Sequence, residues 1–240
     1  MRSRLLPTSS LTQTVREAMR RLLRSHFDGI TQQGFDEDLA NKNWAVLIEN
    51  DGGALVGFST MAFIRTRHAE HPINVVYSGD TIVDPSAWGS TSLFRSWIDA
   101  IRQLRTQSPD APTYWLLIVS GTRTYRLLPL FWTQFYPRCD RRTPHRNQLL
   151  LDQLAIERYG ADYHQATGIV RFARPQVLKA PLRETAPARR HNRNARYFYD
   201  RNPGHSRGDE LACLTELSDS NLTRAGRRIA ATLRTSLEPR

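Results

Sequence analysis

Residues 74–95 hold the pattern that most directly predicts chemistry. A strand-like run ends at Val83-Asp84-Pro85, and a polar loop with one glycine, Gly89, follows before a helix opens. In such a loop several backbone N–H groups converge on one point, and the helix dipole adds partial positive charge there. A pyrophosphate group is negatively charged and could bind to these N–H groups. An ordinary strand-to-helix turn gives the same pattern, so the loop alone leaves both interpretations open.

Two strands joined by a tight turn precede this loop. Residues 44–49 (WAVLIE) are a compact apolar run that predicts a buried strand, and residues 55–64 predict its partner. Between them, Asn50-Asp51-Gly52-Gly53 is a strong hairpin signal. Further upstream, apolar positions three or four apart predict a helix from Ser10 or Thr12 to about His26, and a short helix follows around residues 36–41.

The elements around and after the loop alternate between strand and helix. Polar residues 65–72 predict a loop, and residues 74–83 predict a third strand. A helix should then run to about Arg105, followed by a buried strand over 114–119 and an aromatic-rich helix over 122–135. A strand–helix–strand order of this kind favours a parallel pair of strands.

The last hundred residues have a different character. Pro- and Arg-rich residues 175–196 predict a loop or flexible segment. The other expected elements here are a helix over 148–159, strands over 168–172 and 210–217, and a helix over 222–233. We therefore expect two parts, a core over residues 1–140 and an extension over residues 141–240 that packs on it.

The order of elements and the loop pattern together resemble the GNAT superfamily of acyl-CoA N-acyltransferases, over about residues 12–137. Val83-Asp84-Pro85 matches the family's strand end, and Gly89 matches the first glycine of its pyrophosphate loop. The resemblance implies a mixed α/β (α+β) fold of the GNAT type, with acyl-CoA as co-substrate. The residues that it places on the cofactor are Ile82, Val83, Trp88, Gly89, Ser90, Thr91 and Ser92.

The loop departs from the family pattern at three positions. Trp88 stands where the family usually has Arg or Gln, Thr91 replaces the second glycine, and Leu93 replaces a third small residue. Losing a glycine leaves less room for close approach of a phosphate. The hydroxyls of Ser90, Thr91 and Ser92 would compensate in part. Two alternatives therefore stay open, an acyl-carrier-protein donor and a core that has lost catalysis.

The resemblance implies direct acyl transfer from a thioester to an amine. The strand that ends at Val83 would hold the donor, and a backbone N–H there would polarise the thioester carbonyl. A base must take a proton from the amine, and the candidates are Asp80, His68 and His71. Strand alternation places Asp80 opposite Val83 and on the face of Ser78 and Ile82. The alternatives are a salt bridge from Asp80 to an arginine and solvated positions for the histidines.

Tyrosines of the predicted helix over 122–135 and just beyond it are the candidate acids for the thiolate. Tyr125 and Tyr136 fall where the family often places such a residue, and Pro129 is expected to kink the helix. The alternative for Tyr125 is an aromatic stripe of the core. Aromatic and thioether side chains could also line a tunnel for a long acyl chain, namely Phe58, Met61, Phe63, Phe131, Trp132 and Phe135.

The chain has 240 residues and a formal net charge of +11, carried almost entirely by arginine, since Lys42 and Lys179 are its lysines. This balance favours anionic partners or reflects codon composition alone. Cys139 and Cys213 fit no metal spacing, so we expect no metal and reduced thiols. Without a signal peptide or an apolar run of membrane-spanning length, the protein is expected in the cytoplasm.

Arginines beside aromatic residues form one further pattern. Residues 189–196 (RRHNRNAR) precede Tyr197-Phe198-Tyr199, which could bind single-stranded nucleic acid, form a lid, or be a solvated linker. The run lacks the lysines and glycines of many RNA-binding tails, so nucleic acid is not the partner we expect. The prediction is an N-acyltransferase that uses acyl-CoA or an acyl-carrier protein and a small-molecule or peptide amine. The alternative is a catalytically silent core that binds a protein or nucleic acid.

Overall fold

The computed structural model describes residues 1–87, 92–183 and 192–235. These residues form two compact units. Among the described residues, unit 1 comprises Met1–His26 and residues 30–87, 92–113 and 226–235, and unit 2 comprises Phe27–Gly29 and residues 114–183 and 192–225. Both combine antiparallel strands with helices, which confirms the mixed α/β class that the sequence predicts.

The sheet of unit 1 has the order β1-β3-β4-β5, and each neighbouring pair is antiparallel. Its strands are β1 (Arg2–Pro7), β3 (Trp44–Glu49), β4 (Leu55–His68) and β5 (His71–Val83). The apolar run of β3 is buried at its four central positions, as its composition predicts. The turn before β4 is closed by a hydrogen bond from Gly53 N–H to the Asn50 carbonyl, 3.0 Å long, and Gly53 has a φ of 80°.

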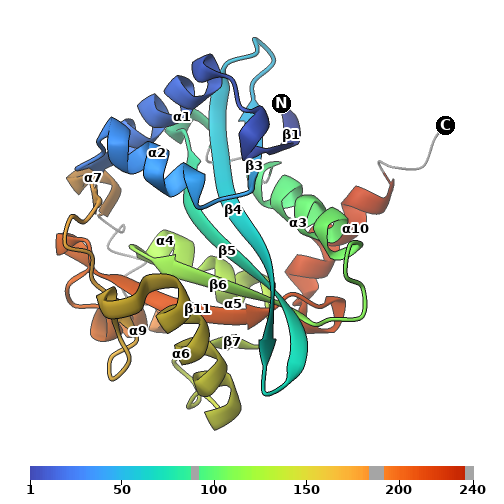
Figure 1. Cartoon of the computed structure of the whole chain (residues 1–240), viewed down its shortest axis with the longest axis vertical. Helices are drawn as coiled ribbons and strands as arrows, with labels where there is room; N and C mark the ends of the chain where they lie inside the picture. Colours follow the sequence, from blue (N-terminus) through green and yellow to red (C-terminus); the bar gives the residue numbers. More distant parts are fainter. Residues whose placement is uncertain (88–91, 184–191, 236–240) are drawn as a thin grey trace. The chain divides into compact units, whose positions relative to one another are not determined.

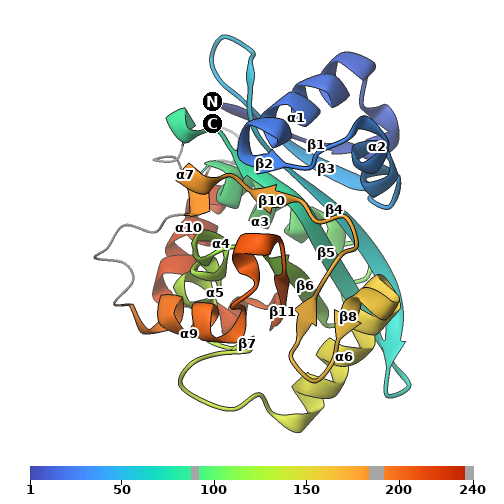
Figure 2. The ribbon, with the colours of Figure 1, turned by 90° about the vertical axis from the view of Figure 1, so that its left-hand side faces the viewer.

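Helices cover both faces of this sheet (Figure 2). On one face lie α1 (Gln13–His26) and α2 (Gln32–Ala40), and on the other lies α3 (Ser92–Arg105). The predicted bounds of α1 and α3 are confirmed to within a few residues, because their apolar stripes are strong. The C-terminal helix α10 (Arg224–Thr235) joins α3 through a 2.9 Å hydrogen bond from the Arg102 guanidinium to the Ala230 carbonyl.

The β4–β5 hairpin is longer than the sequence predicts (Figure 1). Residues 65–72 were expected to form a loop, but β4 runs to His68 and pairs with His71 at the start of β5. The two residues of the turn, Ala69 and Glu70, have φ values of 46° and 65°. A two-residue turn with both φ values positive usually carries Gly or Asn, and their absence removed the sequence signal.

The sheet of unit 2 has the order β6-β11-β9-β8, and β7 also pairs with β11. Its strands are β6 (Thr113–Val119), β7 (Phe135–Tyr136), β8 (Tyr163–His164), β9 (Ile169–Val170) and β11 (Glu210–Glu216). β11 is antiparallel to β6, from Leu211 opposite Val119 to Glu216 opposite Tyr114. A separate two-stranded ribbon joins β2 (Phe27–Asp28) to β10 (Val177–Leu178).

Helix α6 (His145–Tyr159) lies on one face of this sheet, and α4 (Thr122–Tyr125), α5 (Leu127–Phe131) and α9 (Arg193–Arg201) lie on the other (Figure 2). The long helix predicted over 122–135 is thus wrong. It is interrupted at Arg126 rather than kinked at Pro129, which occupies the first turn of α5, where proline is tolerated. Residues 135–136 belong to β7 instead.

One expectation about the C-terminal hundred residues needs correction. Residues 175–196 are not one irregular segment, because β10, α7 (Ala180–Arg183) and the first turn of α9 fall within them. The Asn192 side chain caps α9 by accepting from the N–H groups of Asn194 and Ala195. The two compact units divide at 113/114, and β11 of the last hundred residues joins the sheet of β6 and β7, while the core over residues 1–140 and the extension over residues 141–240 stay a prediction.

Candidate functional site

A β-bulge interrupts the β4–β5 ladder near the end of β5. Asp80 and Thr81 together oppose the single residue Ser59, and Asp80 has a φ of 35°. The Ser59 and Thr81 hydroxyls lie 2.8 Å apart, within hydrogen-bond distance. The flanking pairs stay in register, Phe58 with Ile82 and Thr60 with Gly79. A bulge removes its residues from one-to-one pairing, bends the strand and often adjoins a functional site.

The bulge changes which side chains share a face of the sheet. Alternation predicts that Ser78, Asp80 and Ile82 face the same way. In the structure Ser78 pairs with Met61 while Ile82 pairs with Phe58, and these two β4 residues lie on opposite faces. The prediction of a common face is therefore wrong, because the extra residue shifts the alternation. Asp80 itself is half-buried.

A partly buried ion pair lies beside Gly79, the residue before the bulge. The Lys42 ammonium is 2.6 Å from one carboxylate oxygen of Asp38, and the Lys42 side chain is 5% exposed. A Cβ atom on Gly79 would lie 3.0 Å from the Lys42 Nζ atom. Only a residue without a side chain leaves the ammonium this much room. No sequence pattern indicates this pair, because Lys42 is a single lysine that follows a short predicted helix.

Polar groups with unused hydrogen-bonding capacity gather on this side of the strand. The second carboxylate oxygen of Asp38 and the hydroxyl of Thr60 are buried and have no hydrogen-bond partner among the described residues. Thr60 is opposite Gly79 in the ladder, so it shares the face that Lys42 covers. Lys42 uses one of its three N–H donors on Asp38. Unsatisfied buried groups are rare, and such a cluster indicates a place for a polar ligand.

The end of β5 is held in place by side chains. His26 is buried at the end of α1, and its Nε2 atom lies 3.1 Å from the Val83 carbonyl oxygen. The Asp84 carboxylate accepts hydrogen bonds from the N–H and the hydroxyl of Ser86, and these lower the pKa of Asp84. A short 3₁₀ turn over Pro85–Ala87 follows. These contacts fix the position of the last residues of β5 and of the turn that follows.

The residues expected to hold a cofactor fall into two groups. Ile82 is buried and Val83 is half-buried at the end of β5, and Ser92 begins α3. The four other predicted residues lie outside the described part of the chain, namely Trp88, Gly89, Ser90 and Thr91.

Tyr125 is a core residue of unit 2. Its side chain is fully buried, and its hydroxyl donates a 2.9 Å hydrogen bond to the Pro137 carbonyl. Its ring packs against Phe135 and Phe198. Burial raises the pKa of Tyr125 far above its usual range. This geometry favours the alternative of an aromatic core over the role of an acid, and the same holds for Tyr136, which is buried in β7.

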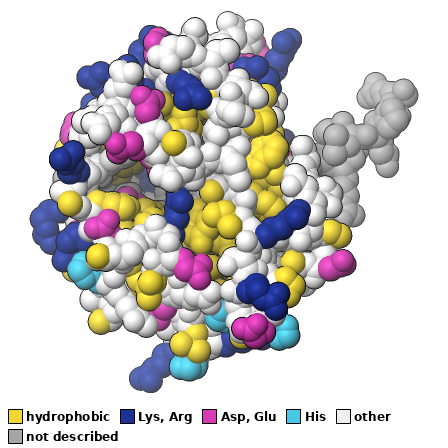
Figure 3. Space-filling model, in the orientation of Figure 1, with side chains coloured by type: hydrophobic (Ala, Val, Ile, Leu, Met, Phe, Trp, Pro, Cys, Tyr) yellow, Lys and Arg dark blue, Asp and Glu magenta, His cyan; other side chains and the backbone are white. Residues whose placement is uncertain are grey.

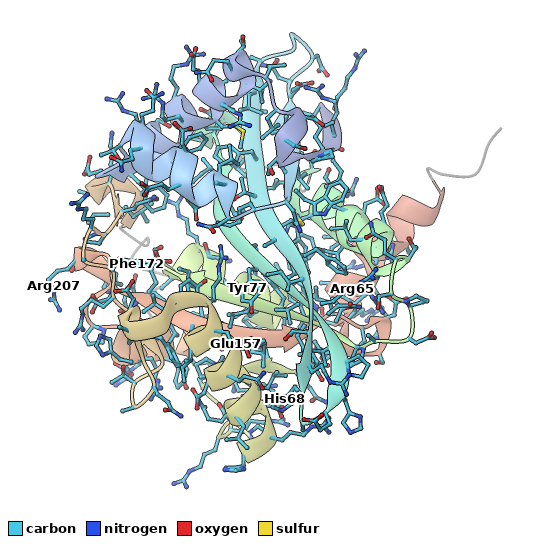
Figure 4. The ribbon with its side chains drawn as sticks, in the orientation of Figure 1. Arg65, His68, Tyr77, Glu157, Phe172 and Arg207 are labelled. Atoms are coloured by element: carbon cyan, nitrogen blue, oxygen red, sulfur yellow. The ribbon has the colours of Figure 1, made fainter. Side chains whose placement is uncertain are left out.

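The two loop histidines lie far from the bulge. His68, labelled in Figure 4, lies at the turn end of the β4–β5 hairpin, where it pairs with His71 in the ladder. Asp80 is further along the same strand, roughly 30 Å from His71 at about 3.3 Å per residue. The two histidines therefore do not join the group of polar residues around Gly79.

The side chains proposed to line an acyl tunnel are buried within the cores of the two units. Trp132 packs on Trp115 with ring centroids 5.2 Å apart, and on Phe131 at 6.0 Å. All six of the proposed residues are buried, namely Phe58, Met61, Phe63, Phe131, Trp132 and Phe135. Their contacts are those of a packed interior. Among the described residues, no cluster of His, Cys, Asp or Glu is arranged to hold a metal ion.

Residues 189–191 of the arginine-rich segment lie outside the described part of the chain, and of the three aromatic residues that follow it Phe198 is buried while Tyr197 and Tyr199 are half-buried. Phe198 and Ala195 of α9 are fully buried, and Phe198 packs against Tyr125. Figure 3 shows Lys and Arg side chains spread over the visible face, with Asp and Glu side chains between them. Stacking on bases needs exposed rings beside a positive groove, so this pattern gives little support to the nucleic-acid alternative. Within the described residues, no helix has the length and apolar character to cross a membrane.

Comparison with solved structures gives a consistent type of neighbour. A probable N-acyltransferase from Enterococcus faecalis is 12% identical with a TM-score of 0.40, and the match covers 56% of this chain and 33% of that one. A GNAT-family N-acetyltransferase from Escherichia coli, solved with CoA, is 13% identical with a TM-score of 0.38, covering 52% of this chain and 67% of that one. The chain is similar to GNAT-type structures over about half of its length.

A third neighbour is glucosamine-6-phosphate N-acetyltransferase from Arabidopsis thaliana, 13% identical with a TM-score of 0.38, covering 53% of this chain and 88% of that one. No protein-family model matches the sequence. No curated protein matches it either. Because the identities and TM-scores are low, a functional proposal must rest on the chain's own residues.

Proposed function

We propose that this protein is an N-acyltransferase that moves an acyl group from a thioester to an amine. The observation that carries the proposal is the bulge at Asp80 and Thr81, beside the fixed end of β5. A bulge turns backbone groups out of the ladder, and a backbone N–H fixed in this way can donate to a thioester carbonyl oxygen. Positioned donors stabilise the negative charge that develops on that oxygen during attack.

The reaction needs a positioned donor, a neutral amine and a place for one proton. The amine lone pair attacks the carbonyl carbon, and the C–N bond forms as the C=O π electrons move to oxygen. When these electrons return, the C–S bond breaks and the thiolate leaves. The amine gives up a proton, which we assign to the Asp80 carboxylate, and water then carries this proton from Asp80 to the thiolate, so the carboxylate is restored. General-base assistance of this kind contributes roughly 10²–10⁴-fold in rate.

The polar cluster beside Gly79 suits the acceptor. The spare N–H groups of Lys42 can bind an anionic or carbonyl group of an amine-bearing molecule, and the free oxygen of Asp38 can accept from its N–H or O–H groups. Thr60 adds a hydroxyl on the same face. The acceptor class that fits is a small molecule or peptide that carries an amine and a second polar group.

Acyl-CoA is the donor that we propose. The loop after β5 resembles a pyrophosphate-binding loop in sequence, and its Gly89 is the position at which a large side chain would block phosphate approach. A fatty-acyl donor and an acyl-carrier protein are the finer alternatives, and both keep the same transfer chemistry.

The decisive measurement is release of free thiol from acetyl-, octanoyl- and palmitoyl-CoA in the presence of a panel of amines. The Asp80→Asn variant should lose at least tenfold in kcat, since it keeps the side chain's shape and loses the base. Asp110→Asn is the matched control, because Asp110 is an exposed carboxylate of the same unit. Equal turnover in both variants would remove Asp80 from the mechanism.

Binding is tested separately by thermal shift with the same three thioesters. A shift that is lost in Gly89→Trp and kept in Gly52→Trp would place CoA at the loop, since Gly52 is an exposed glycine of the turn between β3 and β4. No shift with any CoA would reject the acyl-CoA donor, and turnover with an acyl-carrier protein would then decide between the carrier-dependent enzyme and a silent core.

A further inference from the structure

A cavity of about 760 Å³ is lined by residues of unit 2 alone. One wall is the loop from β7 to α6, which runs beside α9 before it reaches α6 (Figure 2). The other walls come from α6, from the turn after β8, from α9 and from Ala212 of β11. A cavity of this size accommodates a small molecule such as a nucleotide or a sugar phosphate.

Four arginines line the cavity, and two aspartates stand among them. The Asp140 carboxylate is already paired with the Arg138 guanidinium through both of its oxygens, and this pairing lowers the pKa of Asp140. The remaining arginines are Arg141, Arg142 and Arg201. Since Asp140 is neutralised by Arg138, these three leave the cavity with an excess of positive charge.

The second aspartate is satisfied by neutral donors. Asp152 is buried on α6, and its carboxylate accepts hydrogen bonds from the Tyr163 hydroxyl at 2.6 Å and from the Gln148 and Gln165 side chains at 2.9 and 3.1 Å. These bonds join α6 to β8 and to the turn that follows it. Asp152 therefore holds the wall of the cavity together and offers little to compete for the free arginines.

The three remaining arginines have donors to spare. Arg201 spends one Nη2 hydrogen bond, 2.9 Å long, on the Thr167 carbonyl. Arg141 is 4.0 Å from Asp140, which Arg138 already occupies, and Arg142 has no hydrogen bond or ion pair to a described residue. Each guanidinium presents five N–H groups in a planar fork that matches a phosphate.

Tyr197 completes the polar lining. Its ring is half-buried, and its hydroxyl makes no hydrogen bond to a described residue. Burial raises the pKa of Tyr197, so the hydroxyl keeps its proton at neutral pH and can donate it. A phenol and three guanidinium groups around one cavity therefore supply more hydrogen-bond donors than the acceptors of the cavity use.

We propose that this cavity binds a small molecule that carries a phosphate group, such as a nucleoside monophosphate or a sugar phosphate. The oxygens of a phosphate group accept the bidentate hydrogen bonds that arginines supply. A carboxylate accepts the same bonds, but it carries one negative charge where a phosphate monoester can carry two. The site is independent of the proposed acyl transfer, because its residues belong to unit 2 and none of them is assigned to the β5 bulge.

The test is isothermal titration of the full chain with inorganic phosphate, ribose 5-phosphate and AMP, with adenosine as the uncharged counterpart. We expect saturable binding of at least one phosphate compound and none of adenosine. The Arg141→Gln/Arg142→Gln double variant and the Arg201→Gln variant should each bind about tenfold more weakly or worse. Arg196→Gln, an exposed arginine of α9 outside the cavity, should bind like the parent protein.

Two results would overturn the proposal. One is equal affinity in the parent and in both cavity variants, which would place the phosphate elsewhere on a basic chain. The other is no saturable binding of any phosphate compound, or adenosine binding as strongly as AMP. Because Arg141 and Arg142 are exposed, the double variant should remain folded, and its thermal unfolding midpoint checks this directly. Thioester turnover plays no part in the readout.

Discussion

The two candidate sites of this protein are built in different ways. In unit 1 the site is an irregularity within regular strands, where a bulge lies at Asp80 and where Gly79, which has no side chain, leaves room for the buried ammonium of Lys42. In unit 2 the cavity is formed by a loop, two helices and a turn, and long arginine side chains line it. Strands hold backbone groups and short side chains in fixed positions, which suits a reaction at a single atom of the substrate. Loops and helix ends carry long cationic groups, which suits recognition of a charged ligand.

The largest expected effect comes from removing the aromatic support of the unit 2 cavity. Phe198 is fully buried and packs on Tyr125, Tyr199 and His205. Phe198→Ala should lower the free energy of unfolding by about 3–5 kcal/mol, because the lost ring leaves an empty space among the core side chains of unit 2. It should also weaken phosphate binding, since α9 carries Tyr197 and Arg201. Urea denaturation measures the first effect. A loss below about 1 kcal/mol would mean that α9 is not packed as described.

An intermediate effect is expected at the charge pair of unit 1. Lys42→Met removes the ammonium and leaves the Asp38 carboxylate without its partner, which should cost about 1–3 kcal/mol, given that Asp38 is partly exposed. Adding Asp38→Leu should recover part of that loss, because both polar groups are then gone. The surface pair of Arg4 with Glu49 is the control, where Arg4→Met should cost about 1 kcal/mol or less. Equal costs at the two pairs would contradict the burial of Lys42.

The smallest effect concerns the pH dependence of unit 2. Arg171 holds the pKa of Asp209 below its usual value through two hydrogen bonds. A lowered carboxyl pKa stabilises the folded protein at pH values above the unfolded pKa, about 3.9, and this contribution is lost as the pH falls through the folded value. Asp209→Asn should therefore lower the unfolding midpoint at pH 6 and leave it nearly unchanged near pH 2. Asp200→Asn, on the exposed face of α9, should show no such pH dependence.

Strong local patterns made much of the fold predictable from the sequence. The strand over residues 44–49 and the helix ending at Arg105 were predicted with their observed limits, because apolar residues there follow a clear period. β1 and β7 were missed, since β1 has an exposed half and β7 has two residues. Both depend on pairing with distant strands, which a local pattern does not encode.

The candidate site was harder to predict for the same physical reason. Asp80 was singled out as a carboxylate in an apolar strand, but the bulge that surrounds it arises from pairing with β4. The Lys42–Asp38 pair and Gly79 carried no signal, because the sequence does not show that a glycine faces an ammonium across two elements. Tyr125 matched a family position by sequence, while its burial depends on Phe198, more than seventy residues later in the chain.

The antiparallel pairing of β6 with β11 has a consequence for how the chain is made. Roughly a hundred residues separate the two strands, so at about 5–20 residues per second the ribosome needs roughly 5–20 s to deliver the partner of β6. During that interval the apolar edge of β6, with Leu116, Leu117 and Val119, lacks the strand that pairs with it in the finished protein. Unpaired apolar edges invite association with other chains. Nascent chains stalled before β11 should therefore be the form of this protein that most needs a chaperone.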